Sequence, residues 1–361
     1  RHIILTVASV EAKTLLRSWF FRVFTILTLG ILTLLNIVMF TLSFSQWMHR
    51  GMGASVPYTN ILLLNMAQAV IAVFLASEFL KFDRKLDTTE SIYPRSMTNT
   101  DYVIGKTLGI MSVFLGLNVA VLILSFVFNV FFTEVRIIPA LYLYYPLILS
   151  VPALVFMFGL SFLAMVIIRN QATTFLILLG WTAAALLFLG SRWYGIFDFM
   201  GMHVPLMYSD FIGFGNFRVI FLQRGIYFFI GVGCILSTAL LLGRLTQSQV
   251  VRNATAFLAA LSFLCGIASG AVYLKHCTGG VKLRALIREL NRSLANEPAV
   301  TITACDLSLT HAGREIEAEA RLTFTNGTDQ PLTACRFSLN PGFKILRAAN
   351  GDKSLPVETR L

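Results

Sequence analysis

The stretch Pro139–Ile168, PALYLYYPLILSVPALVFMFGLSFLAMVII, contains 30 residues without a charged side chain. A helix needs about 20 apolar residues to cross a bilayer, so this stretch is long enough on its own. Its apolar residues are continuous rather than alternating with polar ones, which excludes a strand of a membrane barrel. The stretch therefore predicts a transmembrane helix.

Six further apolar stretches predict a polytopic α-helical membrane protein with about seven transmembrane helices. The composition agrees, because 56% of the 361 residues are hydrophobic and only 13% are charged. Soluble domains have about 25% charged residues. The other predicted spans are Arg22–Ser45, Pro57–Leu80, Ile104–Phe132, Ala172–Gly190, Gly225–Gly243 and Ala254–Leu274.

The basic residues are distributed unevenly across the alternating loops. Up to Lys275, 12 of them fall on one side of the predicted topology and 6 on the other. Cytoplasmic loops carry the excess of Lys and Arg, so the N-terminus is expected in the cytoplasm. After seven crossings, the C-terminal tail is expected outside. The net charge of +11 then favours anionic lipid headgroups, and no nucleic acid is expected as a partner.

Two segments of the predicted transmembrane domain, residues 1–275, do not look like spans. Residues 3–21 are amphipathic, with Glu11, Lys13 and Arg17 interrupting the apolar face, and predict a helix that lies along the inner leaflet. The alternative is that they begin the first span. The loop 191–224 is aromatic but rich in glycine, and predicts short interfacial helices at the outer mouth of the bundle.

The composition changes after the last span. Residues 276–299 carry leucines at helical spacing and predict a linker helix. Residues 300–361 predict the beginning of an external antiparallel β-sandwich, because apolar and polar residues alternate strictly through 315–325. Ile316, Ala318, Ala320, Leu322 and Phe324 are expected on its core side. A Cys305–Cys335 disulfide remains open, and we expect the chain to be part of a longer protein.

The sequence lacks the motifs of an enzyme. It has no H-E-x-x-H, no G-x-S-x-G and no metal-ligand spacing of cysteines, so no catalytic or metal-binding residue is predicted. Gly105-Lys106-Thr107 ends like a P-loop but lacks the upstream glycine and strand, so Lys106 is interpreted as an anchor at the inner interface. The spans also lack the ionisable residues of ion-coupled transporters, so energy for transport is expected from elsewhere.

Neutral polar side chains do occur within the spans. They join helices more often than they hold a substrate, and that structural role is the one expected here. These residues are Asn36, Asn65, Gln68, Asn118 and Asn129.

Three features make the first 275 residues resemble the permease subunit of type-2 ABC transporters. The first is the basic helix Glu11–Ser18 before the first span. The second is a polar stretch between the second and third spans, which runs from Glu78 to Glu90, through Tyr93-Pro94-Arg95-Ser96, to Asp101-Tyr102-Val103-Ile104-Gly105-Lys106. The third is the broken aromatic loop Leu206–Asn216. The sequence departs from the family at Asp87, where glycine is usual, and by having seven spans instead of six.

This resemblance implies a non-enzymatic permease, here expected to be an exporter, energised by a separate P-loop ABC ATPase. Residues 81–103 would form the coupling segment that docks on that ATPase. ATP and Mg would be bound by the ATPase, so no cofactor is expected in this chain. A second permease half, as a homodimer or a tandem half, would complete the transporter. The implied coupling residues are Asp83, Arg84, Lys85, Asp87, Glu90, Tyr93, Pro94 and Arg95, and the implied external gate residues are Tyr208, Asp210, Phe211 and Phe214.

The tail from Val300 to Leu361 resembles the N-terminal β domain of aminopeptidase-N-type zinc metallopeptidases, whose zinc motif would lie beyond Leu361. The whole resemblance implies a bacterial inner membrane, with the C-terminal domain on the periplasmic side. Two alternatives remain open: a membrane anchor that displays the external domain without transport, and a sensor. An anchor would not need a coupling segment, and a sensor would need a cytoplasmic output domain. Lipid, peptide and drug all remain open as substrates.

Overall fold

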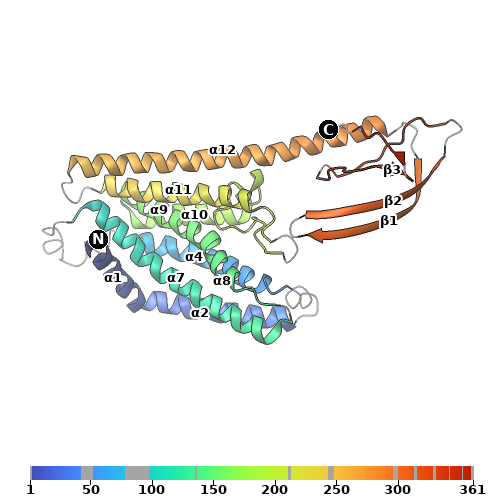
Figure 1. The fold of residues 1–361 in the computed structure, drawn as a ribbon. Coiled ribbons are helices and arrows are strands. Elements are labelled where there is room, and N and C mark those ends of the chain that lie inside the picture. The colour runs from blue at the N-terminus through green and yellow to red at the C-terminus, as the bar shows by residue number, and fades with distance from the viewer. Residues whose placement is uncertain are drawn as a thin grey trace. The chain divides into compact units, whose positions relative to one another are not determined.

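A computed structural model describes residues 2–41, 52–77, 97–134, 136–209, 213–242, 248–295, 300–312, 315–327, 331–340, 342–351 and 353–358. The chain forms two compact units, Arg1–Val281 and Lys282–Leu361. The first is a bundle of helices and the second contains the strands (Figure 1).

Among the residues that the structure describes, seven helices are long and apolar enough to cross a membrane, as the sequence predicts. An integral membrane protein follows from their length and hydropathy. α9 follows α8 (Pro139–Tyr145) through η1 (Pro146–Ser150), and α10 continues into η2 (Ala185–Leu189). The candidate spans are α2 (Trp19–Thr41), α4 (Ser55–Ser77), α7 (Asn99–Phe132), α8 to α9 (Val151–Ile168) as one stretch, α10 (Gln171–Ala184) with η2, α11 (Phe217–Leu241) and α12 (Gln249–Leu294).

A separate helix, α1 (His2–Arg17), precedes the first span, whereas the amphipathic prediction extended to residue 21, and residues 19–21 belong to α2. The helical pattern is interrupted at Ser18, and α2 begins one residue later. α1 lies against α7 at two glycines. A Cβ added at Gly105 would lie 2.9 Å from the carbonyl oxygen of Ile4, and one at Gly109 would lie 2.5 Å from that of Ala8. Only glycine permits so close an approach of two helices.

The core of the bundle is centred on α9 and α11. A Cβ at Gly159 of α9 would collide with the carbonyl oxygen of Gly231 on α11, so these helices also meet backbone to backbone. Aromatic rings fill the space around them: Phe156 of α9 stands edge-on to Tyr227 of α11, with ring centroids 5.2 Å apart. Among the candidate spans, α9 is the most buried and α12 the least.

The last span and the predicted linker helix, as far as Leu294, form one uninterrupted helix. α12 runs for 46 residues from Gln249 to Leu294, and the boundary between the two units falls inside it. Gly279 and Gly280 do not break it, since a helix tolerates glycine at a cost of about 1 kcal/mol each.

The second unit contains a long antiparallel hairpin of β1 (Val300–Ala312) and β2 (Glu315–Asn326) and a short pair, β3 (Ala349–Asn350) with β4 (Lys353–Ser354). The register pairs Ala318 with Leu309 and Ala320 with Leu307, so the apolar residues of both strands share one face. The predicted alternation is therefore confirmed. The predicted sandwich is not seen among the described residues, where each sheet has two strands and the shared apolar face is exposed.

The two cysteines considered for a disulfide, Cys305 and Cys335, are free and exposed in the structure.

Candidate functional site

Most residues implied by the resemblance cannot be located. All eight implied coupling residues, from Asp83 to Arg95, lie outside the described residues, as do Asp210 and Phe211. Tyr208 and Phe214 are described, and the structure brings them together with ring centroids 5.3 Å apart.

These two aromatic residues close the loop between α10 and α11 against the bundle. The backbone N–H of Tyr208 donates to the hydroxyl of Tyr145, 3.1 Å away. Tyr58 of α4 in turn donates its hydroxyl proton to the carbonyl oxygen of Val204 at 3.0 Å. Beyond Tyr208, Ser209 and Gly213 pair through two backbone hydrogen bonds of 2.8 and 3.1 Å. The loop is therefore fixed to both α4 and α8.

The earlier part of this loop differs from the interfacial helices that the sequence predicted. Only η3 (Trp193–Gly195) is helical there, and Phe199, Met200 and Leu206 are buried. Asp198, also buried, organises the turn. Its carboxylate accepts the backbone N–H groups of Gly201, Met202 and His203 at 2.9, 3.0 and 2.6 Å. Backbone donors of this kind stabilise a carboxylate away from water.

Two side chains of α11 donate hydrogen bonds to the backbone of the same loop. Arg224, 2% exposed, donates to the carbonyl oxygens of Phe199 at 3.0 Å and Asp198 at 2.5 Å. Gln223 donates to the carbonyl oxygens of Gly195 and Asp198 at 3.1 and 3.0 Å. Arg224 also donates to the amide oxygen of Gln223 at 2.7 Å. We call Asp198, Gln223 and Arg224 the loop anchor.

A second polar group lies within the bundle, beside the loop. It joins Asn65 and Gln68 of α4, Asn118 of α7 and Ser150 of η1, and we call these four residues the polar seam. The hydroxyl oxygen of Ser150 lies 2.7 Å from the side-chain oxygens of both Asn65 and Asn118. Asn65 also donates to the carbonyl oxygen of Met200 at 3.3 Å, which connects the seam to the loop.

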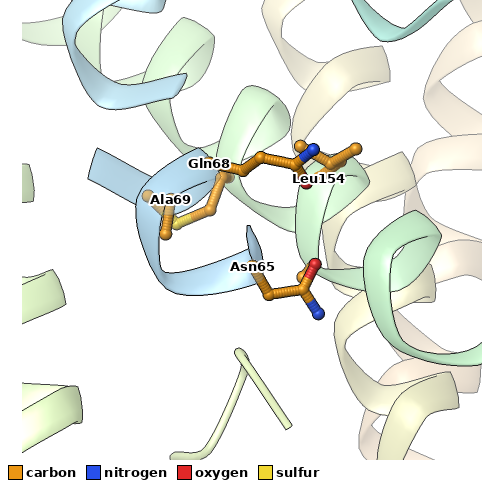
Figure 2. Close-up of a pocket in the computed structure, with 6 residues that line it drawn as sticks. Asn65, Gln68, Ala69 and Leu154 are labelled. Carbon is orange, nitrogen blue, oxygen red and sulfur yellow. The ribbon is translucent and has the colours of Figure 1, made fainter. Parts of the chain in front are cut away.

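The seam borders a small hollow between α4 and α9 (Figure 2). The hollow contains about 160 Å³ of space between atoms, none of it wide enough for a water molecule. In Figure 2 the carboxamide of Gln68 extends across it toward Leu154. The lining residues are Asn65, Gln68, Ala69, Ala153, Leu154 and Met157.

The neutral amides in the spans join helices, as predicted from the sequence. Asn36 of α2 and Asn60 of α4 exchange side-chain hydrogen bonds of 2.8 and 3.1 Å. Asn129 of α7 donates to the hydroxyl of Tyr142 at 2.6 Å. Asn65 and Asn118 meet through Ser150, so the seam also connects three helical elements. This structural role is compatible with a further role in binding.

A buried charge lies near the N-terminal end of α7. Lys106 was interpreted from sequence as an interface anchor, but the structure buries its side chain and places Nζ 3.7 Å from Oε1 of Glu11 on α1. α7 begins beside it with a capping box, in which Thr98 and Asp101 satisfy each other's backbone N–H groups. α1 and the first turns of α7 are thus joined both by charge and by the close approach at Gly105.

Sequence reasoning missed Ser150 and the anchoring role of Arg224. Ser150 stands between Pro146 and Pro152, and the π-helical turn η1 directs it into the bundle. Proline lacks a backbone donor, so such a pair is a usable signal of an irregular turn. For Arg224, the signal was a charge beside an amide, Gln223, on a buried helix face.

In the part of the chain that the structure describes, no group of three metal-ligating side chains occurs. No family model matches the chain, and no curated protein matches it.

Proposed function

We propose that this protein is the membrane subunit of an ATP-driven transporter of the type-2 ABC permease kind, an exporter energised by a separate P-loop ATPase. The observation that carries the proposal is the pairing of α1 with the start of α7. Such a transporter needs a path along which a movement at the ATPase surface reaches the spans. Segment 81–103 runs into the first turn of α7. α1 packs closely against α7 at Gly105 and Gly109 and forms an ion pair with Lys106.

The length of α7 supports this path. A 34-residue helix spans about 51 Å, at 1.5 Å per residue, so one rigid element connects the coupling segment to the opposite end of the bundle. Because α1 is fastened to its first turns, the two helices would move as one body. The loop anchored by Arg224 lies at that opposite end of the bundle, where transport requires the movement to arrive.

The buried chemistry of the bundle supports an external energy source. The polar seam consists of amides and a hydroxyl, which neither take up nor release protons near neutral pH. Ion-coupled transporters place acids or bases near the middle of the membrane. Arg224 is buried, but its donors are directed to backbone carbonyls and the amide of Gln223.

One observation favours the alternative function, a membrane anchor for an external domain. α12 continues beyond its span through Lys282 to Leu294, shortly before the strands in the sequence. An anchor needs this continuity, whereas transport does not.

Crosslinking can separate the two functions. A photo-reactive amino acid at position 85 should capture a protein with a P-loop ATPase motif, identified by mass spectrometry, and the captured complex should hydrolyse ATP. The same probe at position 136, in the loop between α7 and α8, is the control and should not capture it. Capture from neither position would favour the anchor, and capture from position 136 alone would contradict docking of the ATPase on segment 81–103.

A further inference from the structure

The polar seam has fewer protons than acceptor oxygens. Ser150 has one hydroxyl proton, yet its oxygen lies 2.7 Å from the amide oxygens of both Asn65 and Asn118. The orientation of both amides follows from their other bonds. Asn118 donates to the carbonyl oxygen of Phe114 at 2.8 Å, and Asn65 to that of Met200, so flipping either amide would bring two oxygens together. One of the two amide oxygens therefore lacks the proton of Ser150.

Gln68 adds a further acceptor to the same group. Its Nε2 faces the carbonyl oxygen of Phe114 at 3.5 Å, the carbonyl that Asn118 also uses. Its Oε1 has no hydrogen-bond partner among the residues that the structure describes, and the side chain is 1% exposed. Buried polar atoms are nearly always paired, so this oxygen marks a position where a donor belongs.

The surroundings restrict what that donor can be. The residues that line the hollow are all uncharged, so a cation would be buried without a counter-charge. The guanidinium of Arg224 binds the carbonyl oxygen of Phe199, next to the Met200 carbonyl that Asn65 uses, and its charge would further oppose a cation. An anion would face acceptor oxygens. A neutral N–H or O–H donor satisfies both conditions.

We propose that the polar seam is the recognition site for a neutral hydrogen-bond donor, an amide N–H or a hydroxyl, carried by an otherwise apolar transported molecule. This inference rests on the proposed transport function and names its substrate class. Ala69, Ala153, Leu154 and Met157 supply the apolar contacts that such a molecule needs. Because the hollow has no room for a ligand as it stands, the proposal requires α4 and α9 to separate when the donor binds.

A matched pair of ligands tests this directly. N-methyldecanamide has one N–H donor, whereas N,N-dimethyldecanamide has the same chain and carbonyl but no donor. Binding of each to the full chain in lipid nanodiscs is measured by equilibrium dialysis, with empty nanodiscs correcting for partition into lipid. The donor amide should bind about fivefold more tightly, the contribution of one net hydrogen bond. Equal affinities would overturn the proposal, as would tighter binding of decylammonium than of either amide.

Two variants locate the effect. Gln68→Met keeps the volume of the side chain but removes the unpaired oxygen, so it should abolish the preference and leave the thermal midpoint equal or higher. Ser125→Ala is the control, because Ser125 is buried on the same helix as Asn118 but bonds only its own helix, to Val121. It should retain the fivefold preference. A preference retained in Gln68→Met, or a lower midpoint, would show that Gln68 is only a structural residue.

The outcome is independent of the partner ATPase. If crosslinking at position 85 succeeds and the two amides bind equally, the transporter stands and its recognition site lies elsewhere. If crosslinking fails and the preference is present, the seam binds donors but the proposed energy coupling is wrong.

Discussion

The loop of residues 193–209 and the hairpin of residues 300–326 reverse the usual association of regularity with burial. The loop has almost no regular structure, yet Phe199 and Leu206 are fully buried in it. The hairpin consists of 12- and 13-residue strands in nearly continuous register, yet Leu309 is 59% exposed.

The difference lies in what satisfies the backbone. Irregular backbone inside an apolar bundle must receive its hydrogen bonds from side chains, because no water is available there. The loop receives them from Tyr58, Asn65, Asp198, Gln223 and Arg224, which come from α4, α11 and the loop itself. The two strands of the hairpin pair with each other on their facing edges, and their outer edges are exposed, where water can bond the backbone. The hairpin therefore needs no such support, and its apolar face lacks a covering layer among the described residues.

The largest effect is expected from removing the charge that anchors the loop. Arg224→Met would leave the carbonyl oxygens of Asp198 and Phe199 without donors and the nearby buried carboxylate of Asp198 without a compensating charge. We expect a loss of about 3–5 kcal/mol in the free energy of unfolding, measured by thermal or denaturant unfolding in detergent. Arg218→Met, at an exposed position in the first turn of the same helix, is the control and should change stability by less than about 0.5 kcal/mol. Equal effects of the two variants would contradict the anchoring role.

A smaller loss is expected from Asp198→Asn. An asparagine oxygen can still accept from one or two of the three backbone donors, but the remaining N–H would stay buried and unpaired. We expect a loss of about 1–3 kcal/mol, together with faster amide hydrogen exchange at Gly201, Met202 and His203. Glu134→Gln, at an exposed acid, should leave both unchanged. Unchanged exchange at these three amides in Asp198→Asn would show that the carboxylate does not hold the turn.

The smallest effect is expected in the hairpin. Phe324 is 40% exposed and contacts Phe337 with ring centroids 5.5 Å apart. Phe324→Ala should therefore cost about 0.5–1.5 kcal/mol, the contribution of one aromatic pair, measured by hydrogen exchange of the paired strands. A loss of about 3–5 kcal/mol would instead indicate a covered face, as in the predicted sandwich. Glu319→Gln, on the polar face, is the reference with no expected change.

The sequence predicts most of the fold because hydropathy and periodicity are local properties. The seven spans and the strand alternation both follow from residues close together in the chain. The predicted helix boundaries were less accurate where polar side chains cap or extend a helix. The third span was expected from Ile104, but α7 begins at Asn99 because Thr98 and Asp101 cap it and Lys106 is paired with Glu11.

The candidate site could be predicted only in part, since it depends on distant pairings. The amides Asn65, Gln68 and Asn118 were found by their polarity. Ser150, which joins two of them, lies 85 positions after Asn65 and 32 positions after Asn118 in the chain. No periodic pattern encodes such a contact. The burial of the loop around Asp198 likewise depends on Arg224, 26 residues later.

Energy coupling through the segment 81–103 is tested most directly by reconstituting the permease, without the crosslinking probe, together with the ATPase identified from position 85 and measuring ATP hydrolysis. With the wild-type protein in nanodiscs, the permease should stimulate ATP hydrolysis. Arg84→Glu combined with Lys85→Glu should abolish the stimulation without lowering the amount of protein in the membrane. Two charges are reversed because a single exposed ion pair with the ATPase would contribute less than about 1 kcal/mol to binding. Lys282→Glu combined with Arg284→Glu, an equal charge reversal on α12, should preserve it. Unchanged stimulation in the first double variant would contradict a coupling role for this segment.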